Sequence, residues 1–416
     1  MKKLRKIVCI GMLFLILASC SKKGESPTQE VSSNQIEPFT QDNPHTQEVI
    51  SIIRHPRAVD FNAEFPEYYV PKRDQLPDIN EFGYDLRSTD LTSLDLSKEY
   101  DKLINASYDS KTIWPKLLPT NFDPKKILEL YKNPGLNVRS LHEKGITGQG
   151  VGIGIIDFTL LVDHIEYKDQ LKYYNEHRVA EDEPASLHGG AVASIAVGKS
   201  IGVAPESNLY YIADNHENDE YANGIVAGDI IELLDLNKTL PYKNRIRVIS
   251  ISWGFDASIK EGHDIIEAAF ARAKKEGVFV ISTSISDREN KEFFGLNKIP
   301  LSDPDDYNTY TENVFSNDNK KYKISVPMSF RTVAYPTGDD EYAVFGQGGL
   351  SWATPYVAGL YALACQVYPE VTIDQFWEVA YGTSRSSYGI YNGESYVANY
   401  IVNPVAMIEK IRSMSK

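Results

Sequence analysis

Short apolar runs separated by a helical pattern mark this chain from residue 150 onward. Residues 150–157, 248–254 and 278–282 are runs of this kind, and each contains or follows a glycine. Such runs are typical of strands that are buried on both faces of a parallel sheet. Between the last two runs, residues 259–276 carry apolar side chains at helical spacing. The alternation predicts an α/β fold, with a doubly wound, mostly parallel sheet flanked by helices.

The first twenty residues show a different pattern, a basic start followed by a short apolar core. Four basic side chains precede the apolar residues 7–18, which are too few to span a bilayer and are typical of a secretory signal. Residues 17–20 read Leu-Ala-Ser-Cys and resemble the bacterial lipobox. We expect residues 1–19 to be a lipoprotein signal peptide and Cys20 to carry the lipid. The alternative is an ordinary signal in which Cys20 is incidental.

The composition of the chain changes twice between this signal and the strand-rich region. Residues 20–46 are rich in Ser, Thr, Gln, Asn and Pro, a composition typical of a disordered tether. Residues 47–135 contain enough aromatic and aliphatic side chains to fold in part, but they carry no assignable motif. This N-terminal extension is interpreted either as an inhibitory propeptide or as a segment packed permanently on the domain that follows, residues 136–416.

Ser351 is the first candidate for chemistry. It lies among small residues, directly before an apolar helix that we expect to open with Thr354 and Pro355, because proline fits a first helical turn. Free N–H groups and the helix dipole at such a helix start favour developing negative charge. The position therefore suits a nucleophile whose reaction passes through an oxyanion. The alternative is a serine that only caps a buried helix.

A serine nucleophile needs a base and a carboxylate that orients the base. Among eight histidines, His188 differs because it opens the small-residue segment 187–198, which predicts a closely packed helix with the imidazole at its start. Asp157 ends a buried strand, the end at which ligand and catalytic groups gather in open α/β sheets. A structural histidine and a helix-capping aspartate remain the simpler alternatives for the two residues taken singly.

Taken together, the three segments resemble the motifs of the subtilisin-like serine proteases, the subtilase family, which has the same Asp, His, Ser order. Residues 188–193 resemble its His-Gly-Thr-x-Val-Ala motif, with Gly190 in place of threonine. Residues 349–359 match its Gly-Thr-Ser-Met-Ala-Thr-Pro-His-Val-Ala-Gly motif at most positions. The aspartate motif departs from the family pattern, because Phe158 and Thr159 replace the usual Thr or Ser and Gly. The resemblance covers about residues 136–416, which we expect to be a subtilisin-like peptidase domain.

The resemblance implies a serine endopeptidase that acts on peptides or proteins and needs no cofactor for its chemistry. Ser351 would be the nucleophile, His188 the general base and then acid, and Asp157 the group that orients the imidazole. A further implication is that Ser252, Trp253 and Gly254 pair with an extended substrate and shape one wall of its primary pocket.

The oxyanion hole is the point at which the chain departs most from the family. Subtilases carry an asparagine whose amide donates to the oxyanion, and this chain has Ser286 at the equivalent position. Asn290 is the alternative donor if its loop folds back. The departure keeps a second function class open, a catalytically weak or inactive protein of this fold that binds peptides or relays a signal.

The composition limits the classes of partner that the protein can bind. The formal net charge of −14 disfavours binding to nucleic acid and adhesion to anionic lipid, so anchoring should depend on the lipid at Cys20. We expect the protein on the extracytoplasmic face of a bacterial cell membrane. The acidic run 303–306 is either a structural calcium site or a solvated loop. With Cys9 removed and Cys20 lipidated, Cys365 stays as a buried core thiol and no disulfide forms within one chain.

Overall fold

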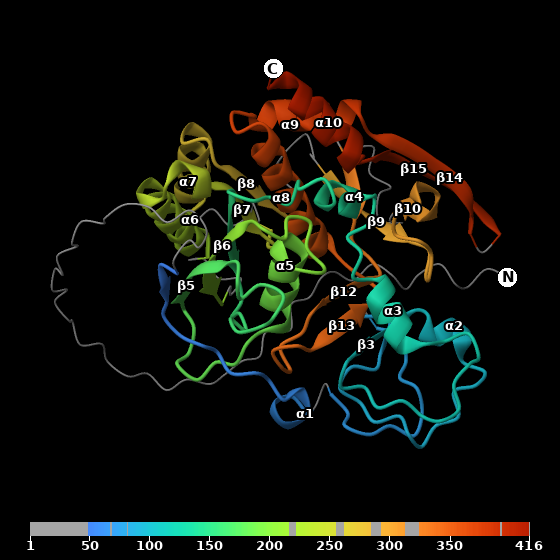
Figure 1. The fold of residues 1–416 in the computed structure, drawn as a ribbon. Helices are drawn as coiled ribbons and strands as arrows, with labels where there is room; N and C mark the ends of the chain where they lie inside the picture. Colours follow the sequence, from blue (N-terminus) through green and yellow to red (C-terminus); the bar gives the residue numbers. More distant parts are fainter. Residues whose placement is uncertain are drawn as a thin grey trace. The chain divides into compact units, whose positions relative to one another are not determined.

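A six-stranded parallel sheet lies at the centre of the structure. This computed structural model describes residues 49–66, 69–80, 82–215, 222–254, 262–283, 293–312, 324–391 and 393–415 (Figure 1). The central sheet has the strand order β1-β5-β6-β4-β7-β8, and all of its pairings are parallel. Its strands are β1 (Ser51–Ile52), β4 (Gly152–Asp157), β5 (Leu171–His177), β6 (Asn208–Asp214), β7 (Ile246–Ile251) and β8 (Phe279–Ser282).

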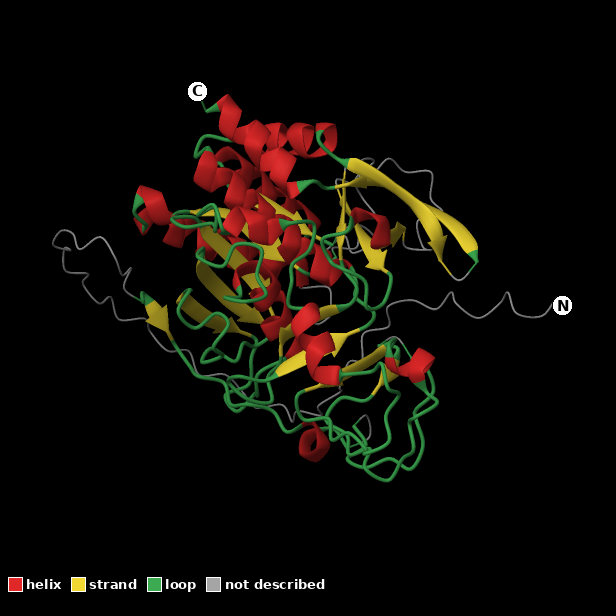
Figure 2. Cartoon of the chain, turned by 45° about the vertical axis from the view of Figure 1, so that its right-hand side comes forward, coloured by secondary structure: helices red, strands yellow, loops and turns green. Residues whose placement is uncertain are grey.

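Helices cover both faces of this sheet, because alternate side chains of its strands point to opposite sides. In β4, Ile153 and Ile155 pack in a core with α5 and α8, whereas Ile156 packs in a second core with α6 and α7. Figure 2 shows the strands between these helices. The predicted doubly wound α/β fold is confirmed. The flanking helices are α5 (Leu187–Val197), α6 (Ala222–Thr239), α7 (His263–Lys275) and α8 (Leu350–Val367).

A second, mixed sheet lies beside α8 and was not predicted from the apolar pattern. Its order is β10-β9-β11-β15-β14, and β14 and β15 form a long hairpin that extends away from the helices (Figure 2). The hairpin alternates polar and aromatic residues, so it reads as neither a buried strand nor a helix. The elements are β9 (Phe293–Lys298), β10 (Tyr310–Glu312), β11 (Ile324–Pro327), β14 (Arg385–Tyr391) and β15 (Glu394–Ile401).

The N-terminal extension shares two sheets with the rest of the chain. β1 adds to the edge of the central sheet beside β5, and β3 pairs with β13 in a four-stranded sheet of order β12-β13-β3-β2. A separate small core joins extension residues such as Leu86 and Tyr108 to Val344 of β13. The strands are β2 (Tyr84–Asp85), β3 (Ala106–Asp109), β12 (Arg331–Ala334) and β13 (Tyr342–Phe345).

The remaining helices are short or lie at the C-terminal end. α10 packs against α8 and α9, and α4 packs against α10. Within the described residues, no helix combines the length and hydropathy that a bilayer crossing requires. The expected signal peptide, Cys20 and the polar tether lie outside those residues. The helices are α1 (Phe61–Glu64), α2 (Tyr100–Leu103), α3 (Pro124–Leu130), α4 (Val138–His142), α9 (Ile373–Gly382) and α10 (Pro404–Met414), with 3-10 turns η1 (Tyr242–Asn244) and η2 (Tyr307–Thr309).

Candidate active site

Asp157 is the last residue of β4 and lies at the carboxyl end of the central sheet. It is 1 % exposed, so its carboxylate needs polar partners. Its Oδ1 atom accepts a hydrogen bond from the backbone N–H of Phe158 at 2.9 Å. The same oxygen lies 2.7 Å from Nδ1 of His188. The buried carboxylate predicted from the sequence is therefore paired with the predicted histidine.

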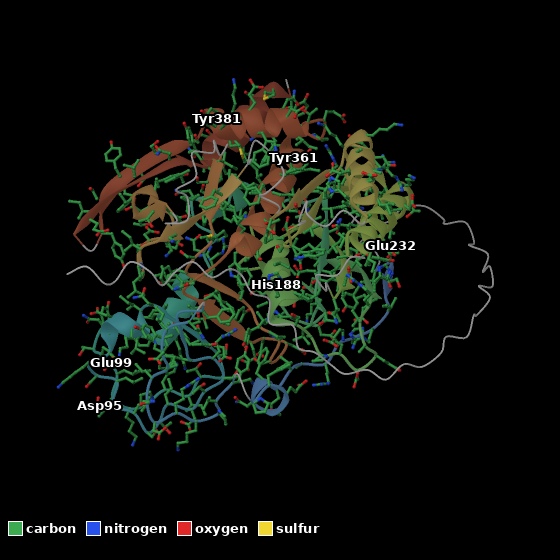
Figure 3. All side chains as sticks on the ribbon, turned by 180° about the vertical axis from the view of Figure 1, so that it is seen from behind. Asp95, Glu99, His188, Glu232, Tyr361 and Tyr381 are labelled. Atoms are coloured by element: carbon green, nitrogen blue, oxygen red, sulfur yellow. The ribbon has the colours of Figure 1, made fainter. Side chains whose placement is uncertain are left out.

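His188 is the second residue of α5, and the hydroxyl of Ser186 caps that helix by accepting from the His188 N–H at 3.2 Å. Figure 3 shows His188 on α5, in the interior of the side-chain view. Because a carboxylate only accepts hydrogen bonds, the contact with Asp157 implies that Nδ1 carries the proton. In the neutral ring, Nε2 is then unprotonated and can take a proton.

Gly189 allows the start of α5 to reach the end of β4. A Cβ atom on Gly189 would lie 2.5 Å from the carbonyl oxygen of Phe158 and 2.6 Å from the hydroxyl of Tyr211. These distances are shorter than van der Waals contact, so a larger residue would push α5 away from β4. The small residue after His188 thus sets the approach of the imidazole to Asp157.

Ser351 lies in the first turn of α8, which begins at Leu350 with Gly349 as its N-cap. The helix therefore starts before Thr354, where the sequence pattern placed it, and Pro355 lies inside the helix rather than in its first turn. Proline has no N–H to donate to the carbonyl oxygen four residues earlier, which is that of Ser351. The hydroxyl of Ser252 donates to this oxygen instead, at 2.9 Å.

The hydroxyl of Ser351 donates to the carbonyl oxygen of Ser252 at 3.3 Å. Ser351 is 8 % exposed, and its reciprocal contacts with Ser252 tie α8 to the end of β7. Within the described residues, the Ser351 hydroxyl bonds to this carbonyl and not to His188. The structure thus joins His188 to Asp157 and Ser351 to Ser252.

Two aromatic rings flank the imidazole of His188. Trp352, which follows Ser351, meets it edge-on with ring centroids 5.4 Å apart, and Phe158 does the same at 5.8 Å. His188 is therefore adjacent to the start of α8 even though it does not bond to Ser351. Sequence reasoning missed both rings as site residues. The available signal was that Phe158 and Trp352 occupy positions at which the chain departs from the family motifs.

Tyr211 is a third neighbour that the sequence did not single out. Its hydroxyl donates to the carbonyl oxygen of Phe158, the residue after Asp157. Complete burial raises the pKa of Tyr211 well above its usual value, and the negative charge of Asp157 acts in the same direction. Tyr211 therefore stays protonated and holds the end of β4 as a hydrogen-bond donor.

The predicted substrate-binding residues follow β7 directly. Ser252 contacts Ser351 as described, and the carbonyl oxygen of Trp253 accepts from the backbone N–H of Thr283 at 3.1 Å. The Trp253 side chain is buried, and Gly254 is partly exposed. The predicted oxyanion donors Ser286 and Asn290 lie outside the described residues.

The acidic run 303–306 uses its carboxylates within the fold. Asp305 accepts from the side-chain amide of Asn133 at 2.8 Å and from the backbone N–H of Asn137 at 2.7 Å. Over the parts of the chain that the structure describes, no group of three or more His, Cys, Asp or Glu residues is arranged to hold a metal ion. Cys365 is buried, and burial raises the pKa of its thiol to about 11.

Comparisons with known proteins identify the family to which the chain is similar. A model of the family described as "Subtilase family" matches residues 148–392, a span that contains Asp157, His188 and Ser351. A "Subtilisin-like protease 2" from Arthroderma otae is 26% identical over 225 residues, which are 52% of this chain and 50% of that protein. Its counterpart from a second Arthroderma otae strain is 27% identical over 224 residues, 52% of this chain and 49% of that protein. The chain spans about half the length of these curated relatives.

Two solved structures are also similar to the chain. Fervidolysin from Fervidobacterium pennivorans, described as a keratinolytic enzyme related to subtilisin, matches with a TM-score of 0.49 and 18% identity over 66% of this chain and 45% of its own. The prenylagaramide maturation protease PagA matches with a TM-score of 0.46 and 15% identity over 66% of this chain and 98% of its own.

Proposed function

Because the chain belongs to the subtilase family, we propose that it is a serine endopeptidase that hydrolyses peptide bonds through an acyl-enzyme intermediate. The observation that carries the proposal is the 2.7 Å contact between Asp157 and His188 at the carboxyl end of the central sheet, next to the start of α8. Ser351 lies in the first turn of that helix. A carboxylate, an imidazole and a hydroxyl in this arrangement suit acyl transfer.

The first chemical step requires Ser351 to change its hydrogen-bond partner. Its hydroxyl leaves the carbonyl of Ser252 and donates to Nε2 of His188, which accepts the proton as the oxygen attacks the scissile carbonyl. Such contacts are often long or misaligned before a substrate binds. Asp157 stabilises the imidazolium that forms and keeps its ring in position.

Collapse of the tetrahedral intermediate breaks the peptide bond and leaves an ester on Ser351. His188 gives its proton to the departing amine, and a water molecule then repeats the sequence against the ester, which restores the free hydroxyl. The backbone N–H of Ser351 is a candidate oxyanion donor, because the first turn of a helix has N–H groups without intrahelical acceptors. This chemistry needs no metal or cofactor.

The substrate in this proposal is an extended peptide. It would add as a strand beside residues 252–254, with backbone hydrogen bonds supplying affinity and neighbouring pockets supplying specificity. The pairing of Ser252 with Ser351 would then hold the substrate-binding segment and the nucleophile at a fixed separation.

A second candidate is a protein of this fold that binds peptides without cleaving them. The hydrogen bond from Ser351 to Ser252 and the serine at the oxyanion position favour it. Incubation of the wild-type protein with a fluorophosphonate probe distinguishes the two, because only an activated serine reacts. A labelled serine supports the endopeptidase. Absence of both labelling and hydrolysis of an unstructured protein supports the binding protein.

For its location, we propose that the enzyme is held by a lipid on Cys20 at the extracytoplasmic face of a bacterial cell membrane. The motif at residues 17–20 supports this proposal, and the acidic charge makes electrostatic attachment unfavourable. A single lipid chain binds membranes only weakly, so a stable anchor needs more than one acyl group.

The Cys20→Ala substitution should prevent lipid attachment, because no thiol remains to be modified. We expect the protein either to become soluble or to remain as an uncleaved precursor. Membrane fractionation and the mass of the N-terminal peptide measure this. Cys365→Ala is the matched control, since that buried thiol should leave fractionation unchanged. A correctly cleaved Cys20→Ala protein that still sediments with membranes would contradict the lipoprotein proposal.

The oxyanion donor is testable by single substitutions. If Ser286 donates, Ser286→Ala should lower kcat by about tenfold or more with little change in KM, because the contact forms mainly in the transition state. Ser286→Asn should then keep or raise kcat. If Asn290 donates, Asn290→Ala should show the loss instead. If kcat is unchanged in Ser286→Ala, in Asn290→Ala and in the double variant, only backbone N–H groups remain as oxyanion donors.

A further inference from the structure

Arg331, the first residue of β12, is buried, and its guanidinium has no hydrogen-bond partner in the part of the chain that the structure describes. It is 3 % exposed. Among the described residues, none offers a hydrogen-bond acceptor to its Nε, Nη1 or Nη2 atom. Two other arginines differ in this respect. The guanidinium of the buried Arg87 donates twice to Asp85, and that of the partly buried Arg178 donates twice to Asp214.

Among the described residues, the groups that act electrostatically on Arg331 are Tyr356 and Tyr310, and neither supplies a negative charge. The Cζ atom of Arg331 lies 5.4 Å from the ring centroid of Tyr356 on α8. The hydroxyl of Tyr356 donates to the carbonyl oxygen of Gly135 at 3.4 Å, and that of Tyr310 donates to Pro304 at 2.7 Å. Burial raises the pKa of both phenols far above the usual value, more than the nearby Arg331 lowers it. Both rings therefore stay neutral.

A second buried cation, Lys298, is close enough to Arg331 to be affected by its positive charge. Lys298, at the end of β9, is 5 % exposed and donates to the carbonyl oxygen of Ser302 at 3.1 Å. Its Nζ atom lies 4.4 Å from the ring centroid of Tyr131. Burial lowers the pKa of Lys298 to about 7; Asp303 opposes this shift, and the positive charge of Arg331 adds to it. Asp303 is exposed and acts on Lys298, not on Arg331.

This arrangement is unfavourable unless a counter-charge is present. Arginine keeps its proton in proteins, so Arg331 cannot escape the charge by deprotonation as Lys298 can. A buried, unpaired charge is strongly destabilising, and each unsatisfied N–H adds to the penalty. Ordered water could accept the hydrogen bonds but would leave the charge uncompensated. The face of Tyr356 attracts a cation but accepts none of its N–H bonds in the usual geometry.

We propose that Arg331 binds a small monovalent inorganic anion, such as chloride, within the core beside Tyr356 of α8, and that Lys298 adds positive potential to this site. A small anion suits the position because one guanidinium charge matches one negative charge, and because Arg331, Tyr310 and Tyr356 are each at most 3 % exposed. Binding there is independent of peptide hydrolysis, so the proposal does not rest on the enzymatic activity.

Thermal unfolding in matched salts tests the proposal. The purified protein carries Ser351→Ala, to prevent self-digestion, and sodium gluconate is exchanged for sodium chloride at constant ionic strength. A ligand present at a hundred times its dissociation constant should raise the Tm of a chain this size by about 3 °C. Arg331→Met should remove this chloride dependence. In gluconate it should also unfold at a higher temperature than the Arg331 protein, because the unpaired charge is gone.

Arg385→Met is the matched control, because Arg385 also lies over a tyrosine, Tyr307 at 4.8 Å, but is exposed. It should keep the full chloride response. If the Arg331 protein responds to chloride no more than Arg331→Met does, the proposal is wrong. Should Arg331→Met not fold, crystals of the Arg331 protein soaked in sodium bromide decide the question. An anomalous peak within hydrogen-bonding distance of the guanidinium supports the site, and its absence refutes it.

Discussion

Replacing Ser351 by alanine is expected to abolish labelling by a fluorophosphonate probe and to lower kcat for peptide hydrolysis by about 10⁶-fold. The hydroxyl oxygen is the only atom of Ser351 that can form the acyl-enzyme, and no neighbouring group in the proposed mechanism can replace it. The fold should be unaffected, because the hydroxyl contributes one 3.3 Å hydrogen bond to Ser252. Probe labelling, kcat and the circular dichroism spectrum measure the three expectations.

Ser250→Ala is the matched control for this substitution. Ser250 lies on β7 two residues before Ser252, is 1 % exposed, and its hydroxyl has no hydrogen-bond partner among the described residues. The Ser250→Ala variant should keep labelling and hydrolysis within about twofold of the wild type, because the substitution removes a hydroxyl that makes no hydrogen bond with the described residues. Activity that survives in Ser351→Ala would assign the nucleophile to another residue.

The second large effect is expected from Asp157→Asn, which should lower kcat by about 10⁴-fold with little change in KM. An asparagine amide can donate to Nδ1 of His188, which would place the imidazole proton on Nε2. His188 would then be unable to accept the proton of Ser351 at neutral pH. Steady-state kinetics at saturating and limiting peptide separate the loss of turnover from any loss of binding.

The chain contains a matched control for this prediction as well. Asp163 and His55 form another of the carboxylate–imidazole contacts in the structure, at 2.8 Å, but both side chains are more than half exposed. Asp163→Asn should leave kcat unchanged. Turnover within tenfold of the wild type in Asp157→Asn would mean that another group orients His188.

Strands β4, β7 and β8 of the central sheet were predictable from the sequence, because they are largely buried and read as short apolar runs. The same feature located Asp157, since a carboxylate at the end of such a run is conspicuous. The pairing of Asp157 with His188 followed from the motif order rather than from the pattern. The second sheet was not predictable, because strands such as β14 are exposed on one side and mix polar with aromatic residues.

Two local details of the site could not be predicted from the sequence, and the physical reasons can be identified. Pro355 suggested a helix start, but α8 begins at Leu350 because the Ser252 hydroxyl satisfies the carbonyl that the proline leaves without a donor. That partner comes from a distant strand, so no local pattern reports it. The partner of the Ser351 hydroxyl depends on the same tertiary contact.

The role of the extension was equally hidden, because two-residue strands such as β1 and β2 have no periodicity to detect. Its packing becomes visible only through the partners, β5 and β13, which lie elsewhere in the chain. Both interpretations of the extension, an inhibitory propeptide and a permanently packed segment, stay predictions.

The pairing of β3 with β13 also sets when this four-stranded sheet can form during synthesis. Ser110, which follows β3, bonds to Tyr342 of β13 across 232 residues of sequence. During synthesis, β3 leaves the ribosome long before its partner strand exists, and contacts of such long range form slowly. Ser351 emerges only a few residues after β13, so the proposed nucleophile and the last strand of that sheet are synthesised almost together. In the proposed endopeptidase, peptide hydrolysis could therefore begin only after β13 and Ser351 have both left the ribosome.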